Sequence, residues 1–378
     1  MGELLDKRTP PLTIAVLGCF LITRSAGLAQ TLTVMQPTAS AISPPLSQIP
    51  NGNNTHGNTA HAHRPVPSHV GAGGMLAGAQ RPVWIDTDPS AIPGGHEVDD
   101  ALALLEAFGS PELSIRGISI VFGNMDLATT SRLGKQIIRE FGPPSTPVFV
   151  GAAGAADLGR ETDATRALGD ALRRERLTIL ALGPATNIAT VVRNHPELAP
   201  RIGEIIAVAG RRPGQKLIAG PKQTNSFRDV NFELDPEAFR ILLSSRIPLT
   251  VTPWEIASKL WLTREDVAAL AGRKPGLASL LPAIEDWLAL WRNRFGAPGF
   301  HPFDTLAVGY LVDRTDLTCS VLDASIETGT DDTSMSASAA EKPYLLVRPL
   351  RRNRRTVKYC HDVAPRFKRD LLRRIAKT

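Results

Sequence analysis

The sequence predicts an α/β fold with a mostly parallel central sheet flanked by helices. From residue 81 onward, short apolar runs alternate with segments whose apolar residues recur at helical spacing. Such alternation implies right-handed crossovers between parallel strands. Unusual polar residues follow several of the apolar runs directly, and the ligand crevice of an open parallel sheet lies at that edge. We therefore expect an open, Rossmann-like sheet with a site at the carboxyl ends of its strands.

The expected elements follow one another in order along the chain. Strands are predicted where apolar runs are short, at 82–86, 113–124, 147–151, 177–183, 204–210, 248–253, 343–347 and 356–360. Helices are predicted where apolar residues fall on one face, at 99–110, 128–142, 186–195, 236–245, 263–272, 277–295, 305–312 and 366–377. The polar stretch 329–342 is expected to be a surface excursion before the last two strands.

The N-terminal segment has the order of an export signal. Lys7 and Arg8 precede the apolar run 11–22, and small residues follow it up to a cleavage site expected after Ala29. The run is too short for stable membrane insertion. Residues 30–80 are rich in Pro, Ser, Asn, Gly and His, which predicts a disordered linker before a folded domain at 81–378. The protein is then periplasmic or secreted; if the leader is instead an unprocessed disordered extension, it is cytoplasmic.

The net charge of +6 is concentrated in the C-terminal segment. From Arg348 to the end, twelve Lys and Arg residues stand against two acids. A solvated turn and an amphipathic terminal helix with a stripe of Leu371, Leu372 and Ile375 account for this charge, so no nucleic-acid partner is expected. Three cysteines are too few for a disulfide scaffold or a cysteine-based zinc cluster. Cys319 and Cys360 can still pair in an oxidising compartment.

Four acids fall where the predicted crevice lies. Asp86 and Asp88 end the first apolar run, and Asp99 and Asp100 open the first helix. A single acid at a helix start is explained by capping, but two adjacent acids together with two more exceed that need. Converging carboxylates repel one another unless a cation neutralises them, and hard oxygen ligands favour Ca²⁺ or Mg²⁺. The alternative is a set of caps and solvated acids without a metal.

Six motifs occur in an order that resembles a known family. They are DTDP at 86–89, DDALAL at 99–104, VFGN at 121–124, ALGPATNIA at 181–189, NFELDPEAF at 231–239 and FDTLAV at 303–308. Over residues 81 to about 375, the chain resembles the inosine-uridine-preferring nucleoside hydrolases. The resemblance implies a Ca²⁺-dependent hydrolysis of the N-glycosidic bond of small ribonucleosides, which releases ribose and free base. It also implies a homodimer or homotetramer.

The resemblance assigns roles to individual residues. The implied calcium ligands are Asp88, Asp100, Asp304 and the backbone carbonyl of Thr186. Asp88 is also the implied general base, because it lies where it can take a proton from the attacking water. Asp304 is expected to cap the helix that follows it and to face the crevice, whereas Asp86 supports the strand end. The implied ribose-binding residues are Asp99, Asn124, Asp229 and Asn231, with Asn225 as a further candidate.

Three departures from the family pattern affect these expectations. The loop between the acid pairs is lengthened to DPSAIPGGHEVDD, and Asp229 replaces a glutamate. Phe303 stands where well-studied members have a histidine that protonates the leaving base. We expect His301 to take over as the acid, with His96 as the alternative. Stacking of the base on a tryptophan can also activate the leaving group, and the candidates are Trp254, Trp287 and Trp291.

Two other function classes remain open from the residues. The IDTD run partly matches the strand-end Asp-x-Asp of haloacid-dehalogenase-like phosphatases, but that class does not explain FDTLAV or GPATN. A non-catalytic exported protein that binds nucleosides or ribose would keep the pocket and lack turnover. Hydrolysis of p-nitrophenyl riboside separates the enzyme from the binding protein, because that leaving group needs no acid.

Overall fold

A computed structural model describes residues 80–333, 340–351 and 355–378. The predicted export signal at 1–29 lies outside the described residues, and so does the predicted linker at 30–80 except for Gln80. Within the described ranges, every helix is too short or too polar to cross a bilayer.

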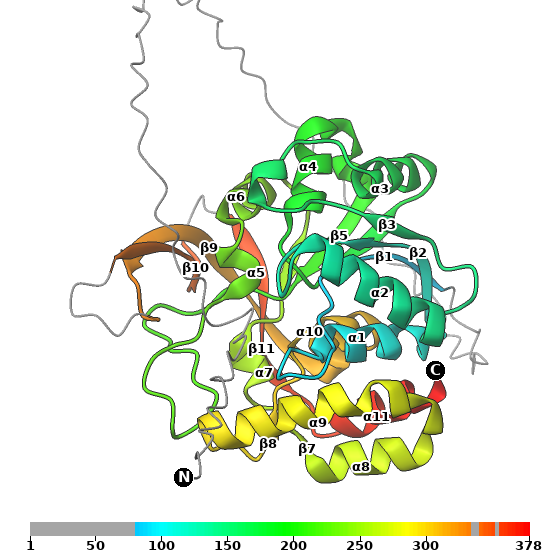
Figure 1. Ribbon diagram of the computed structural model, residues 1–378. Helices are drawn as coiled ribbons and strands as arrows, with labels where there is room; N and C mark the ends of the chain where they lie inside the picture. Colours follow the sequence, from blue (N-terminus) through cyan, green and yellow to red (C-terminus); the bar gives the residue numbers. More distant parts are fainter. Residues whose placement is uncertain (1–79, 334–339, 352–354) are drawn as a thin grey trace, which may run out of the picture. The chain divides into compact units, whose positions relative to one another are not determined.

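A nine-stranded sheet forms the centre of the folded part, in the order β10-β9-β11-β6-β5-β4-β1-β2-β3 (Figure 1). Its strands are β1 (Arg81–Thr87), β2 (Leu113–Ile120), β3 (Val148–Val150), β4 (Leu177–Ala181), β5 (Ile202–Ala207), β6 (Leu249–Val251), β9 (Leu317–Thr330), β10 (Glu341–Arg348) and β11 (Thr356–Val363). Strands β1 to β6 and β11 are parallel, and β9 is antiparallel to both β11 and β10. This confirms the predicted mostly parallel sheet.

The order in which successive strands are added to the sheet reverses at β1. Strand β1 pairs with β2 on one side and with β4 on the other. Connections on one side of β1 lead toward β3, and those on the other side lead toward β6. Parallel sheets bind ligands beyond the carboxyl ends of the strands at such a switch point. The loops after β1, β2 and β4 therefore surround the expected crevice.

Helices cover both faces of the sheet (Figure 1). They are α1 (Asp99–Phe108), α2 (Leu127–Phe141), α3 (Asp163–Arg174), α4 (Thr186–Asn194), α5 (Val230–Glu233), α6 (Pro236–Ser244), α7 (Trp254–Ala257), α8 (Arg264–Arg273), α9 (Leu281–Leu290), α10 (Phe303–Val312) and α11 (Phe367–Lys377). Side chains alternate along β1, so Val83 and Ile85 join the core with α1 and α10, whereas Trp84 joins the core with α3 and α4. A separate two-stranded sheet pairs β7 (Leu262–Thr263) with β8 (Gly299–Phe300).

The long elements α3 and β9 were not predicted, and neither were the short elements α5, α7, β7 and β8. Helix α3 begins at a capping box made by Thr162 and Thr165 and buries Leu168 and Leu172. Strand β9 mixes polar and apolar residues because it lies in the antiparallel part of the sheet, where only some of its side chains are buried. The expected excursion at 329–342 is the connection from β9 to β10, of which 334–339 lie outside the described residues.

The C-terminal predictions are confirmed. Cys319 of β9 lies opposite Cys360 of β11, and the two cysteines form a disulfide. Helix α11 packs against α1 with Phe367, Leu371 and Ile375 buried and Leu372 half-buried. On its other face, Arg374 forms two hydrogen bonds with the carboxylate of Glu112. Five of the twelve basic residues of this segment thus belong to an amphipathic helix on the fold.

Candidate functional site

The first acid of the site holds the strand ends together. Asp86, at the end of β1, accepts hydrogen bonds from the hydroxyl of Ser119 on β2 and from the amide of Asn187 on α4. Asp86 is fully buried, and this desolvation raises its pKa to about 7. Asp86 therefore ties the end of β1 to β2 and to α4, which is the supporting role expected of it.

Three acids converge beside it. Asp99 and Asp100 lie in the first turn of α1, and Asp304 lies in the first turn of α10. One carboxylate oxygen from each lies within 4.8 Å of the other two, and all three side chains are buried. None forms an ion pair with a Lys or Arg in the described part of the chain. The expectation that Asp304 caps α10 is wrong, because Pro302 occupies the N-cap position.

Asp88 joins this group through Asp100. Its backbone N–H donates to Oδ1 of Asp100 at 3.1 Å, and its Oδ2 accepts from the backbone N–H of Asn124 at 2.7 Å. Oδ1 of Asp88 and Oδ1 of Asp99 are buried and have no hydrogen-bond partner among the described residues. Burial, followed by repulsion from neighbouring acids, raises the pKa of Asp88, Asp99 and Asp304 well above the ordinary value.

We name Asp88, Asp99, Asp100 and Asp304 the acid cluster. Buried carboxylate oxygens without a partner are costly, and a bound cation removes both that cost and the repulsion. The donors are hard oxygens, which suit Ca²⁺. The acid cluster therefore fits the predicted metal.

Two glycines let the neighbouring loops reach Asp88. A Cβ at Gly123 would lie 1.9 Å from Oδ2 of Asp88, and one at Gly183 would lie 2.7 Å from Oδ1. Both distances are too short for any side chain at those positions. The glycines of the VFGN and ALGP motifs are thus explained by the close approach of the β2 and β4 loops to this carboxylate.

Thr186 starts helix α4 next to the acid cluster. Its buried hydroxyl donates to Oδ2 of Asp235 at 2.5 Å, which links the start of α4 to the N-cap of α6. This contact fixes the side chain of Thr186 away from a ligand role. The ligand role expected of its backbone carbonyl stays a prediction.

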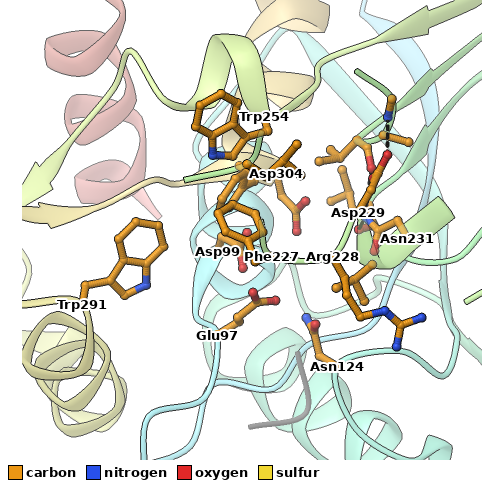
Figure 2. A pocket seen from close by; sticks show the side chains of 17 residues that line it. Glu97, Asp99, Asn124, Phe227, Arg228, Asp229, Asn231, Trp254, Trp291 and Asp304 are labelled. Atoms are coloured by element: carbon orange, nitrogen blue, oxygen red, sulfur yellow. Dashed lines mark hydrogen bonds between the residues drawn. The ribbon is translucent and has the colours of Figure 1, made fainter. Parts of the chain in front are cut away.

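A pocket that is open to solvent lies over Asp99 and Asp304 of the acid cluster (Figure 2). Its acidic half is lined by polar side chains, which are Glu97, Asp99, Asn124, Arg228, Asp229, Asn231 and Asp304. Its aromatic half is lined by rings, which are Phe227, Trp254, Trp291 and Phe303. The mixed polar and aromatic lining suits a small molecule with one hydroxyl-rich end and one flat apolar end.

The residues expected to bind ribose are fixed at the ends of strands. Nδ2 of Asn231 donates to the carbonyls of Leu182 at 2.7 Å and Val208 at 3.2 Å, after β4 and β5. Oδ2 of Asp229 accepts from the backbone N–H of Gly210 at 2.8 Å. The partners in these hydrogen bonds are far apart in the sequence, so the bonds are not part of a local turn. They hold both side chains at the pocket wall. Asn124 donates from Nδ2 to Asp100 at 3.1 Å and also lines the pocket.

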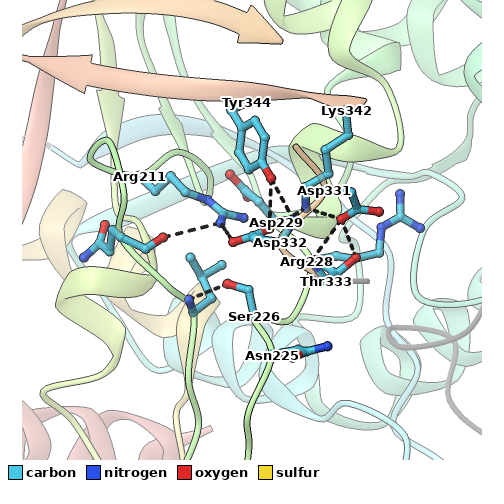
Figure 3. Close-up of polar contacts among 12 residues, drawn as sticks. Arg211, Asn225, Ser226, Arg228, Asp229, Asp331, Asp332, Thr333, Lys342 and Tyr344 are labelled. Atoms are coloured by element: carbon cyan, nitrogen blue, oxygen red, sulfur yellow. Dashed lines mark hydrogen bonds and ion pairs between the residues drawn. The ribbon is translucent and has the colours of Figure 1, made fainter. Parts of the chain in front are cut away.

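Asp229 also borders a second group of charges, which are buried or half-buried (Figure 3). Arg211 pairs with Asp332 at 2.7 Å and with Glu233 at 3.6 Å. Lys342 pairs with Glu233 at 2.8 Å and with Asp332 at 3.0 Å. We name Arg211, Glu233, Asp332 and Lys342 the ion-pair network. Desolvation raises the pKa of Asp229 to about 6, against the opposing effect of Arg211.

Comparisons with known proteins agree with this arrangement. The sequence profile described as inosine-uridine preferring nucleoside hydrolase matches residues 83–367. The chain belongs to this family.

Two relatives and two solved structures illustrate the similarity. Uridine nucleosidase 1 of Arabidopsis thaliana is 26% identical over 267 residues, which cover 62% of this chain and 76% of the relative. Non-specific ribonucleoside hydrolase RihC of Escherichia coli is 26% identical over 280 residues, with coverages of 67% and 86%. The fold matches a plant nucleoside hydrolase, PpNRh1, with a TM-score of 0.64 at 22% identity, over 78% of this chain and 99% of that one. A purine-preferring ribonucleoside hydrolase from Gardnerella vaginalis gives the same TM-score and identity, over 78% and 98%.

The two histidines expected to replace the family acid do not line the pocket of this hydrolase-family chain. His301 is buried, with Nδ1 2.8 Å from the carbonyl of Leu260 and its ring centre 3.9 Å from that of Trp261. Desolvation lowers the pKa of His301 to about 4, so it is neutral near pH 7. His96 is half-buried, and desolvation lowers its pKa as well. This placement corrects the expectation that His301 donates the proton, because packing against the tryptophans turns it into a core residue.

The residues that line the pocket differ in part from those predicted from the sequence. Glu97, Phe227 and Arg228 line the pocket, although no motif singled them out. Glu97 lies in the lengthened loop, whose path to the acid cluster cannot be read from spacing. Asn225 and Trp287, which were candidates, do not line the pocket, and neither do Asp88, Asp100 and Thr186, which the resemblance assigned to the metal.

Proposed function

We propose that the protein is a calcium-dependent hydrolase that cleaves the N-glycosidic bond of ribonucleosides and releases ribose and free base. The observation that supports it most is the acid cluster, which has buried, unpartnered oxygens and reaches, through Asp99 and Asp304, a pocket lined by acids and aromatic rings. Family membership agrees with this activity.

The acid cluster is where the ion would bind. Asp88, Asp100, Asp304 and the carbonyl of Thr186 are the proposed ligands, and the geometry favours adding Asp99 to them. When bound, Ca²⁺ would neutralise the acids and orient the water that attacks the sugar. The ribose end of the substrate would lie over this half of the pocket. Its hydroxyls would bind to Asp99, Asn124, Asp229 and Asn231.

The chemistry then rests on side chains of this chain. Asp88 accepts a proton from the attacking water as general base, and the backbone N–H of Asn124 holds its other oxygen in place. The bond between C1′ and the base nitrogen breaks through an oxocarbenium-like sugar, as in glycoside hydrolysis. Acids around the sugar stabilise its positive charge. The electron pair of the broken bond leaves with the base.

A nucleoside panel tests this proposal. Purified protein is assayed for released ribose with inosine, uridine, adenosine, guanosine and cytidine, and with p-nitrophenyl riboside. We expect turnover of at least one nucleoside and of p-nitrophenyl riboside, loss of both with a chelator, and recovery with added Ca²⁺. Nucleoside binding without any turnover would instead identify the non-catalytic binding protein. The Lys368→Ala variant, far from the acids on α11, serves as a surface control.

Export and assembly complete the proposal. We propose cleavage after Ala29, which places the protein in the periplasm or outside the cell, and a homodimer or homotetramer. N-terminal sequencing of protein from its native host tests the first part, since an intact Met1 on cytosolic protein would contradict it. Light scattering of the purified protein tests the second.

A further inference from the structure

Two tryptophans of the aromatic half carry buried donors with no partner. Nε1 of Trp254 and Nε1 of Trp291 are buried, and neither has a hydrogen-bond partner among the described residues. A buried donor without a partner costs about 1–3 kcal/mol, and such groups in a native fold require an explanation. Both tryptophans line the pocket, so a bound molecule is the natural partner.

Another buried tryptophan shows that this fold can satisfy an indole. Trp84 is also fully buried, and its Nε1 donates to the hydroxyl of Ser119 at 2.8 Å. Trp84 packs in the core on the other face of the sheet, away from the pocket. Among the described residues, the two buried indole donors without a partner both belong to tryptophans that line the pocket.

The aromatic half leads directly to the acid cluster. Its rings form a chain of edge-on or tilted contacts, from Trp254 to Phe227 at 6.5 Å, Phe227 to Phe303 at 6.1 Å and Phe303 to Trp291 at 6.4 Å. Asp304 follows Phe303 directly in the chain. Trp254, Trp291, Phe227 and Asp304 all line the same pocket (Figure 2). A ribose held over the acids would place its base in this space.

We infer that the indole N–H groups of Trp254 and Trp291 donate hydrogen bonds to the leaving base, an inference that rests on the proposed function. The ligand class is a base with two acceptor atoms on its edge, and a 6-oxopurine supplies them as carbonyl oxygen and ring nitrogen. The two donors position the base and stabilise the negative charge that develops on it as the bond breaks. They select against bases whose facing edge carries only donors, because the indoles would then remain unpaired.

This arrangement removes the need for a protonating side chain. The bond from C1′ to the base nitrogen breaks, and its electron pair stays on the base. A new bond forms from C1′ to the oxygen of water, whose proton passes to Asp88. The base departs as an anion held by two N–H donors and then takes a proton from solvent. This reaction needs no general acid. It is therefore compatible with Phe303 in place of a histidine and with the burial of His301 outside the pocket.

Three matched substitutions test the inference. Trp254→Phe and Trp291→Phe keep an aromatic ring and remove the N–H, whereas Trp287→Phe makes the same change one helical turn from Trp291 without touching the pocket. Each variant is assayed with inosine and with p-nitrophenyl riboside, whose p-nitrophenolate leaving group is a stable anion and departs without hydrogen-bond donors. We expect kcat/KM for inosine to fall about 10- to 100-fold in each pocket variant, the usual effect of losing a hydrogen bond to a charged group. Turnover of p-nitrophenyl riboside is retained, and Trp287→Phe leaves the ratio of the two substrates unchanged.

The outcomes separate this inference from the proposed function. Equal losses on both substrates, or no loss on either, would overturn the inference, and so would a selective loss in Trp287→Phe. If the wild-type protein turns over neither substrate, the proposed function fails first. Turnover of p-nitrophenyl riboside also reports that a variant is folded, so Trp254→Phe alone carries the test if Trp291→Phe does not fold.

Discussion

Two groups of buried acids in this structure differ in their counter-charges. In the ion-pair network, Glu233 and Asp332 are matched by Arg211 and Lys342 at 2.7–3.6 Å. In the acid cluster, carboxylate oxygens of Asp99, Asp100 and Asp304 lie within 4.8 Å of one another, and the backbone N–H of Asp88 donates to Asp100. No Lys or Arg of the described residues pairs with any of the four. A balanced group stabilises the fold without any ligand, whereas an unbalanced group is stable only with a cation or with bound protons. The comparison indicates that the first group is structural and the second is the reactive one.

The largest expected effect lies in the acid cluster. Asp88→Asn removes the proposed general base and keeps the volume of the side chain. We expect kcat to fall by about 10²- to 10⁴-fold on a nucleoside that the wild-type protein hydrolyses, because this is the usual contribution of a general base. Steady-state assays of the purified variant measure it, and Lys368→Ala, which removes a charge that pairs with Asp266 outside the pocket, is the control. Full activity of Asp88→Asn would remove it from the mechanism.

The ion-pair network should instead respond in stability. Glu233→Gln leaves Arg211, Lys342 and Arg228 without their shared carboxylate, since Glu233 contacts all three. Breaking a buried pair on one side costs about 3–5 kcal/mol, and we expect the free energy of unfolding to drop by that order. Urea denaturation monitored by circular dichroism measures the change. An unchanged midpoint would show that solvent already screens these charges.

The pH dependence of stability should distinguish the two groups further. Burial raises the pKa of Asp100 to about 6 and that of Asp86 to about 7, so the folded metal-free protein keeps protons that the unfolded chain has lost. The stabilisation is complete below the unfolded pKa near 3.8 and is lost as pH rises through about 6–7. Thermal melts of chelated protein from pH 4 to pH 8 should therefore show a falling melting temperature, and added Ca²⁺ should remove most of the fall.

One substitution isolates the acid cluster in this experiment. Asp304→Asn reduces the repulsion, so it should stabilise the chelated protein at pH 8 by about 1–3 kcal/mol, the common size of a single-residue effect. The pKa of Asp332 is shifted in the opposite direction. Burial alone would raise it, but Arg211 and Lys342 hold it below the ordinary value. A melting temperature that rises with pH in the chelated wild type would contradict the assignment of charges.

The smallest effect is expected at His301. Its ring packs on Trp261 and Trp291 and does not line the pocket, so His301→Gln should change stability more than catalysis. We expect the ratio of kcat for inosine to kcat for p-nitrophenyl riboside to stay the same, with His96→Gln as the control. A selective loss on inosine of about 10²-fold or more would restore His301 as the general acid.

The sequence was informative about the parts of the site that local pattern controls. An apolar run followed by acids places Asp86 and Asp88 at a strand end, and the parallel sheet then brings Asn124 and Thr186 to the same edge. Helix α3 carried a readable signal in Thr162 and its apolar spacing. Strand β9 did not, because its partners lie in strands formed later in the chain.

Long-range packing controls the remainder of the site. Arg211 and Asp332 are separated by 121 residues, so their pairing depends on how the β9–β10 hairpin docks on the pocket wall. The burial of His301 depends on two tryptophans from other elements. Whether an indole N–H has a partner is likewise decided only when the side chains pack. These are the features that motif spacing alone did not predict.

Calcium titration tests the central difference between the two groups most directly. Protein freed of metal is titrated with Ca²⁺ by isothermal calorimetry as wild type, Asp100→Asn and Glu233→Gln. The account predicts one calcium per chain for the wild type and for Glu233→Gln, and no measurable binding for Asp100→Asn. Absence of binding in the wild type, or unchanged binding in Asp100→Asn, would contradict the claim that the unbalanced acids form a metal site.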